Sequence, residues 1–141
     1  MAGMTDLTEM LRNLDPVVRD GGFVYVVRPD DGFDSAEDME WEWVEMEAET
    51  VIVEDEGRTL IVAEGLAADY ELEFDGVFGW ITLQVHSSLH AVGLTAAVST
   101  ALAGAGISCN MLAGFHHDHL LVPLDRLDDA LAVIGSLAAT R

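Results

Sequence analysis

The chain has 141 residues, half of them hydrophobic, which is enough for one ordinary domain or two small ones. Its 26 acidic residues face only six basic ones, all arginine, for a formal net charge of −20. This balance argues against nucleic acid or an anionic membrane as partner, because both require a basic face that neutralises phosphate. The single cysteine, Cys109, excludes an intramolecular disulfide framework and a cysteine-rich zinc site. No apolar run reaches the length of a membrane span, and the first residues lack the pattern of a signal peptide, so we expect a soluble cytoplasmic protein.

The acidic residues are concentrated in the first half of the chain. Between Asp30 and Glu56 there are 13 acids and no base, whereas Gly76 to Leu124 contains one formally charged side chain, Asp118. Such an acidic segment is typical of a solvated face or a loop. The absence of lysine also fits a halophilic protein, in which dense carboxylates hold water and ions. We assign most of the charge to this adaptation, so it carries little information about a ligand.

The N-terminal half predicts short elements of both kinds. Thr5 is placed to cap the first helix, and Trp41 and Trp43 begin an alternation that leads into a strand. In chain order the predicted elements are a helix over 5–14, a turn at 20–22, a strand over 23–27, a loop over 30–38 for which a helical turn at 35–39 is the alternative, a strand over 50–53, a hairpin turn at 56–57, a strand over 59–63, helical turns over 64–69 and an extended stretch over 70–77.

The C-terminal half has a clearer pattern. Apolar and polar residues alternate before the Ser87-Ser88 pair, which is placed to cap the helix that follows. Asp125 is placed to cap the last helix. The predicted elements are a strand over 80–86, a helix that follows the Ser87-Ser88 cap with an apolar stripe at 94, 98, 101, 102 and 105 and is ended by Gly104 and Gly106, a strand over 107–112, a turn at 114–118, a strand over 119–122 and a final helix inward-facing at 127, 131, 134 and 137. This order is β-α-β-β-α, and the first half reads as a looser version of it. We therefore expect two small units, 1–75 and 76–141, packed as one body.

These residues resemble the tandem ACT-domain proteins, related to the regulatory region of aspartate kinase and to arginine sensors of the CASTOR type. The similarity is specific from Trp80 to Pro123, above all in the runs Trp80–Leu89, Ala91–Val98, Gly106–Asn110 and Ala113–Leu120. It is looser from Leu11 to Gly79. The resemblance implies an α+β fold of two ferredoxin-like β-α-β-β-α-β units, with antiparallel sheets and helices on one face. It also implies binding of a free amino acid without catalysis or a cofactor.

Two departures from the family pattern have structural consequences. The acidic insertion from Asp30 to Glu49 is expected to replace the first helix that the resemblance implies for the N-terminal unit. The chain ends soon after its last helix, so the C-terminal unit lacks a fourth strand of its own. An open sheet edge is a liability unless another segment fills it. We therefore expect exchange of strands between the two units.

The junction between the predicted strand and helix, His86 to Leu94, is the first candidate site. A helix N-terminus presents unpaired N–H groups and partial positive charge, which suits an α-carboxylate. Gly93 allows close approach of a ligand, although the alternative is simple capping and packing. The resemblance favours binding, because ACT ligands commonly lie at this junction. The candidate binding residues are His86, Ser87, Ser88, Leu89, Val92, Gly93, Leu94, Asn110, Gly114, Phe115 and Asp118.

Asp118 is the candidate for specificity. In the arginine-sensing relatives an Asp at this motif position faces the cationic end of the ligand, so the resemblance assigns the same role to Asp118. A carboxylate can pair with an α-ammonium or a guanidinium. The alternative is a turn Asp bonded to its own backbone. Asn110 and Ser108 lie on the same face of a predicted strand. This face is either directed toward the helix junction or simply half exposed to solvent.

The histidines around Asp118 raise a metal hypothesis. In an extended chain His117 and His119 share a face, and His86 or His90 could be a third ligand. The spacing matches no established metal motif, so ordinary hydrogen-bonding histidines are favoured and no metal is predicted.

The sequence therefore predicts a non-enzymatic sensor that holds an amino acid at the interface between its two ACT units. A homodimer is expected, because ACT sheets often pair edge to edge. Three alternatives stay open: a structural or interaction module, a metal-dependent enzyme that uses the histidine cluster, and a regulatory subunit of a separate biosynthetic enzyme. No phosphate-binding loop or nucleophile motif supports a catalytic function.

Overall fold

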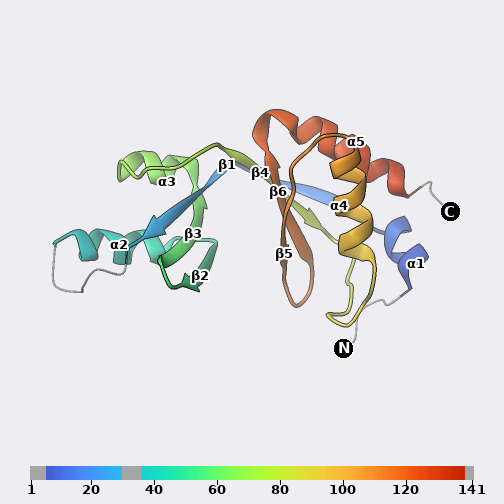
Figure 1. The fold of residues 1–141 in the computed structure, drawn as a ribbon, viewed down its shortest axis with the longest axis horizontal. Coiled ribbons are helices and arrows are strands. Elements are labelled where there is room, and N and C mark those ends of the chain that lie inside the picture. Colours follow the sequence, from blue (N-terminus) through green and yellow to red (C-terminus); the bar gives the residue numbers. More distant parts are fainter. Residues whose placement is uncertain (1–5, 30–35, 139–141) are drawn as a thin grey trace. The chain divides into compact units, whose positions relative to one another are not determined.

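The computed structural model describes residues 6–29 and 36–138, which form two compact units (Figure 1). Unit 1 contains the described residues up to Asp20 and those from Phe78 onward, and unit 2 is Gly21–Val77. The boundary expected near Asp75-Gly76 lies close to one of these limits. The observed division differs from the predicted one in that the residues up to Asp20 belong to the same unit as the C-terminal part of the chain.

Unit 1 is built on an antiparallel sheet. Strand β4 (Phe78–Leu83) pairs with β6 (Asp118–Pro123), which pairs in turn with β5 (Asn110–Ala113) at the edge. Strand β1 (Pro16–Arg28) lies on the other side of β4, so the order in this unit is β1-β4-β6-β5. Strand β6 ends at a proline, which has no N–H group to continue the ladder.

Two helices cover one face of this sheet, α4 (Leu94–Gly104) and α5 (Leu127–Leu137), which lie side by side (Figure 1). In α4 the buried residues recur every fourth position and so form one stripe. They pack against the inward-facing residues of β4 and β6, and Cys109 packs against the same core. Burial raises the pKa of the Cys109 thiol. The fully buried members of this core include Met10, Ile81, Leu83, Val98, Leu102, Leu120, Val122 and Ala130.

Strand β1 belongs to both units. Its first residues fill the sheet edge beside β4, and from Gly21 onward it belongs to unit 2. The prediction of a turn at 20–22 is therefore wrong. Gly21 has φ +82°, a conformation that glycine adopts without a steric penalty, and the strand continues through it. The edge that the last β-α-β-β-α run leaves open is filled by the N-terminal segment, as strand exchange requires.

Unit 2 has a three-stranded antiparallel sheet in the order β2-β3-β1. Strand β2 (Thr50–Glu54) pairs with β3 (Gly57–Ala63), and β3 pairs with the second part of β1. The predicted hairpin and the helical turns over 64–69, which form α3 (Glu64–Asp69), are confirmed. The core of this unit is smaller and consists of the buried residues Val24, Val26, Val44, Leu60, Val62 and Ala67.

The expected replacement of the first helix by the acidic insertion is wrong. Residues Ala36–Met46 form the helix α2, while residues 30–35, predicted as loop, lie outside the described part. The alternation that begins at Trp41 predicted a strand, but these residues are helical. Trp41, Val44 and Ala48 have helical spacing, and all three pack into the core of unit 2. The described part of unit 2 thus contains a helix in the position expected for an ACT unit.

A buried arginine fixes α2 on the sheet. The side chain of Arg28, on β1, is only 4% exposed, and its Nη2 and Nη1 lie 2.7 Å from Glu42 and 3.1 Å from Glu45. The second oxygen of Glu45 binds Arg58 of β3 at 2.7 Å. The hydrogen bond to Glu42 is the main reason why the pKa of Arg28 is raised. Two acids of the insertion, Glu42 and Glu45, therefore have a structural function in addition to solvation.

Three smaller predictions also need correction. The first helix, α1, spans Leu7–Arg12, and the carboxylate of Asp6 accepts the N–H of Glu9 as its cap, whereas Thr5 lies outside the described residues. Asp125 does not cap α5, because it lies within a 3₁₀ turn, Leu124–Arg126, that precedes the helix. The stretch 70–77, predicted as extended, begins with a turn at Tyr70 and Glu71.

The α+β fold, with antiparallel sheets and helices packed on them, is confirmed. None of the helices in the described part of the chain is long and apolar enough to cross a membrane.

The Arg28 cluster generates a stability prediction. Arg28→Met should lower the free energy of unfolding by about 2 kcal/mol, because it leaves Glu45, itself only 22% exposed, with fewer charge partners. Arg58→Met should lower it by less than about 1 kcal/mol, since Arg58 is 43% exposed and the lost pair is screened by water. Urea unfolding followed by circular dichroism measures both. Equal losses in the two variants would contradict the assigned role of Arg28.

Candidate functional site

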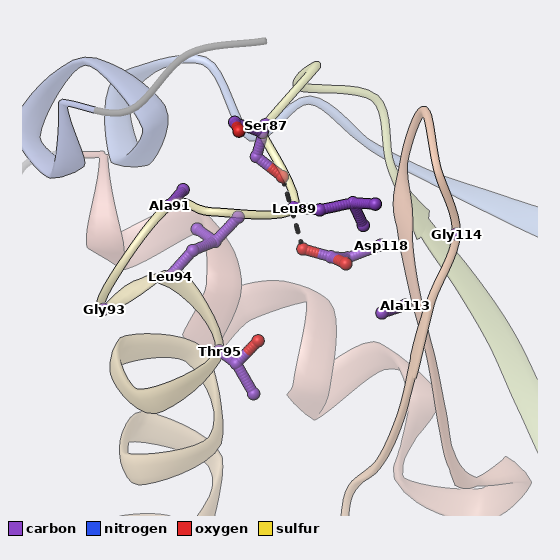
Figure 2. Close-up of a pocket in the computed structure, with 10 residues that line it drawn as sticks. Ser87, Leu89, Ala91, Gly93, Leu94, Thr95, Ala113, Gly114 and Asp118 are labelled. Atoms are coloured by element: carbon purple, nitrogen blue, oxygen red, sulfur yellow. Dashed lines mark hydrogen bonds between the residues drawn. The ribbon is translucent and has the colours of Figure 1, made fainter. Parts of the chain in front are cut away.

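Unit 1 contains a cavity of about 140 Å³ between the loop that precedes α4 and the hairpin that joins β5 to β6 (Figure 2). The loop, the first turn of α4 and the hairpin each contribute to its lining. The lining residues are Ser87, Ser88, Leu89, Ala91, Gly93, Leu94, Thr95, Ala113, Gly114 and Asp118. All ten belong to unit 1.

The loop from β4 to the cavity is held by the backbone that precedes β1. The N–H groups of Gln84 and Val85 donate to the carbonyls of Asp15 and Leu14 at 3.2 and 3.4 Å. Backbone pairing between the two segments thus extends beyond the last residue of β4. Ser87, which follows directly, is 8% exposed, so its hydroxyl is held in a fixed, mostly buried position.

The two serines do not cap α4, contrary to the prediction from sequence. The hydroxyl of Ser87 donates to Oδ2 of Asp118 at 3.4 Å, and the hydroxyl of Ser88 accepts the N–H of His90 at 3.1 Å. Helix α4 begins several residues later, at Leu94. The reason is that the intervening loop folds on itself, as the hydrogen bond from the Ala91 N–H to the Ser88 carbonyl at 3.0 Å shows.

The N-terminus of α4 lies at the cavity without a side-chain cap. Its N-cap residue is Gly93, with φ +102°, and no side chain accepts a hydrogen bond from the first turn. The N–H groups at such an end lack intrahelical partners and carry partial positive charge. Thr95 adds a hydroxyl on the same turn, directed toward the cavity (Figure 2). This side of the cavity can therefore bind an anionic group.

The opposite side of the cavity carries the negative charge. Asp118 is the first residue of β6 and lies opposite Leu83 and Ala113 in the sheet, on the face that the helices cover. The hairpin is closed by the N–H of Gly114, which donates to the His117 carbonyl at 2.9 Å. In Figure 2 the carboxylate points from the hairpin toward Ser87. It is partly buried and suits an ammonium group.

The structure brings together seven of the eleven residues predicted from sequence. Four others do not line the cavity. His86 packs its ring against His116, Val92 is 82% exposed and Phe115 is 64% exposed on the hairpin. Asn110 pairs with Leu121 on the opposite face of the sheet from Asp118, because successive residues of a strand point to opposite faces. The residues that do line it are Ser87, Ser88, Leu89, Gly93, Leu94, Gly114 and Asp118.

Three lining residues were not among those predicted from sequence: Ala91, Thr95 and Ala113. Thr95 could have been found, because a hydroxyl residue two positions after a glycine N-cap lies in the first helical turn. The signal was hidden when the cap was assigned to the serines. The two alanines contribute a methyl group each, and no sequence pattern distinguishes them.

None of the five histidines lines the cavity. The ring of His86 lies 5.5 Å from that of His116 and 6.2 Å from that of His117, centre to centre. His119 is separate, with its Nδ1 2.9 Å from the hydroxyl of Thr82, and burial is the main reason why its pKa is lowered. Among the described residues, no group of three or more His, Cys, Asp or Glu side chains is arranged to hold a metal ion.

Comparison with protein families gives two matches, both to models described as ACT domain. One covers residues 2–79 and the other covers residues 77–135. No curated protein matches the chain.

Comparison with solved structures gives the same fold. A protein of unknown function from Vibrio cholerae, titled a possible transport protein, is 34% identical with a TM-score of 0.78, over 94% of this chain and 95% of that one. The structure of the aspartokinase alpha and beta subunits has a TM-score of 0.64 at 14% identity, over 86% and 95%. The regulatory subunit of aspartate kinase from Thermus flavus has a TM-score of 0.57 at 11% identity, over 86% and 95%.

The glycine at the helix start provides a test of the site's geometry. Gly93→Ala should lower the free energy of unfolding by about 1–3 kcal/mol, because alanine is strained at this φ and its Cβ would lie 3.2 Å from the Leu7 side chain. Gly104→Ala, at the other end of α4, meets no atom within 4 Å and should raise stability by up to about 1 kcal/mol. Thermal unfolding of both variants measures the contrast. A Gly93→Ala protein as stable as the parent would contradict the assigned backbone geometry.

Proposed function

The chain belongs to the ACT domain family, and on this premise we propose that unit 1 binds a small free amino acid and that the protein is a regulatory sensor. One observation carries the proposal. The cavity has an uncapped helix N-terminus on one side and the Asp118 carboxylate on the other. A free amino acid has the complementary pair of charges.

In the proposed complex each pole of the ligand has a partner. The α-carboxylate accepts hydrogen bonds from the N–H groups of the first turn of α4 and from the hydroxyl of Thr95. The α-ammonium, or a cationic side chain, pairs with Asp118. Ser87 already donates to this carboxylate at 3.4 Å, which holds its orientation before the ligand arrives. Such preorganisation reduces the entropy that binding costs.

The size of the cavity limits the ligand. Its volume of about 140 Å³ is close to the roughly 150 Å³ cavity that accepts one benzene-sized molecule. The lining beside the two poles includes Leu89 and Leu94, which favour an aliphatic side chain over a polar one. We therefore favour a small amino acid. A larger one requires the loop over 84–93 to move.

Binding at this place offers a route to regulation. The ligand would connect the loop before α4 to the β5–β6 hairpin, two segments that the Ser87–Asp118 hydrogen bond already joins. It would stabilise whichever arrangement of the protein presents both segments to it, because a ligand shifts an equilibrium only through differential affinity. The proposal needs residues of unit 1 alone, whereas a ligand between two ACT units and a homodimer stay predictions from the sequence.

A regulatory partner of a separate enzyme is the second candidate. It is favoured by the similarity in fold to chains that are regulatory subunits of aspartate kinase. In this case the same cavity would serve as the sensor, and its effect would be measured on the partner enzyme.

The direct test is thermal unfolding of the full chain, in high salt, with each of the twenty amino acids. A ligand at 100 times its dissociation constant, bound only by the folded state, should add about 2.7 kcal/mol of stability. We expect one amino acid or a small group of similar ones to raise the midpoint. The absence of any rise, in a sample that unfolds cooperatively, would overturn the proposal.

The matched variants locate the effect. Asp118→Asn keeps the size of the side chain and its ability to accept from Ser87, but removes the charge, so it should abolish the rise. Asp125→Asn changes the net charge equally at an exposed position of unit 1 that does not line the cavity, so it should retain the rise. A rise that survives Asp118→Asn would place the ligand elsewhere.

A further inference from the structure

Unit 2 has a groove of its own, with a volume of about 360 Å³. Tyr25 and Val27 of β1 and Trp41 of α2 line it, together with Glu71 and Glu73 from the segment after α3. All of these residues lie within Gly21–Val77. The groove is therefore formed within one unit and is independent of the cavity in unit 1.

The groove combines negative charge with aromatic rings. Arg28 follows Val27 on β1 but does not line the groove, and its guanidinium is bound by Glu42 and Glu45. Among the described residues that line the groove, two are carboxylates and none is basic. A cation that enters it would therefore meet no repulsion from the lining.

Each part of the lining favours the same chemistry. The faces of an indole and a phenol ring attract cations, and quaternary ammonium groups are bound in this way. The aliphatic side chains of Val27 and Leu72 suit the CH groups that surround such a charge. A free amino acid is disfavoured here, because its carboxylate would lie near Glu71 and Glu73. We propose that the groove of unit 2 binds an organic cation that lacks a carboxylate, of the quaternary or alkyl ammonium class.

This ligand differs in charge from the one proposed for unit 1. There the first turn of α4 provides a place for a carboxylate, whereas the lining of the unit 2 groove provides none. The groove is also larger, about 360 Å³ against about 140 Å³. Asp118→Asn should therefore leave binding in unit 2 unchanged, and the two proposals can fail separately.

The test uses choline as the probe and the fluorescence of Trp41 as the signal. The full chain carries Trp43→Phe, which removes an indole that is 56% exposed and does not line the groove. Trp80, which is 4% exposed and belongs to unit 1, remains as a constant background. Choline chloride replaces sodium chloride at constant ionic strength. We expect a saturable change in fluorescence. The neutral molecule of the same shape, 3,3-dimethylbutan-1-ol, should bind at least about tenfold more weakly, because it lacks the charge that the rings and carboxylates attract.

Two double variants complete the test. Glu71→Gln with Glu73→Gln should weaken choline binding about three- to tenfold, and both positions are exposed, so the fold should be unaffected. Glu56→Gln with Glu64→Gln makes the same charge change at exposed positions of unit 2 outside the groove and should bind as the parent does. Equal binding of the neutral molecule, or unchanged affinity in the Glu71/Glu73 variant, would overturn the proposal.

Discussion

Strand β1 is the element on which both units depend. A β-α-β-β-α run has an unfilled sheet edge beside its first strand, and an unfilled edge exposes unpaired backbone groups. The first residues of β1 fill that edge in unit 1, and its later residues provide the strand that pairs with β3 in unit 2. The backbone at Leu14 and Asp15 then extends the pairing to Gln84 and Val85, where the loop that lines the cavity begins. The strand that completes the sheet thus also positions the candidate site.

Among the residues that the structure describes, the cavity of unit 1 is lined by a single formally charged side chain, Asp118. Most of the 26 acids lie outside the stretch that forms the cavity, and in unit 2 two of them neutralise Arg28 and Arg58. Asp118 is the one formally charged residue from Gly76 to Leu124. Its partial burial beside Ser87 gives it more influence on a ligand than an exposed acid has, because solvent screens it less. The net charge of −20 therefore does not indicate which ligand binds, whereas the position of the Asp118 carboxylate favours a ligand with a cationic group.

The sequence predicted the C-terminal half better than the N-terminal half, for physical reasons. Ile81 and Leu83 alternate, and Leu94 and Val98 share a helical stripe, so local pattern and tertiary packing agree there. In the acidic segment the alternation from Trp41 competed with a helical pattern, and packing of Val44 against the sheet decided in favour of the helix. Seven residues of the cavity were found because family resemblance and helix-terminus chemistry both point to the junction. The prediction for Asn110 is wrong because alternate residues of its strand point to opposite faces of the sheet and Asn110 lies on the face away from the cavity. The predicted start of α4 is wrong because a loop separates Ser87 from Gly93.

The central claim is that the cavity of unit 1 binds both charged poles of one small amino acid. The most direct measurement is calorimetric titration of the full chain with the amino acid that stabilises it, with its methyl ester and with its N-acetyl derivative. The ester lacks the anion that the N-terminus of α4 would bind, and the acetylated form lacks the cation that Asp118 would bind. The account predicts that the free amino acid binds and that each derivative binds at least about tenfold more weakly. Equal affinity for the ester or for the acetylated form would contradict it.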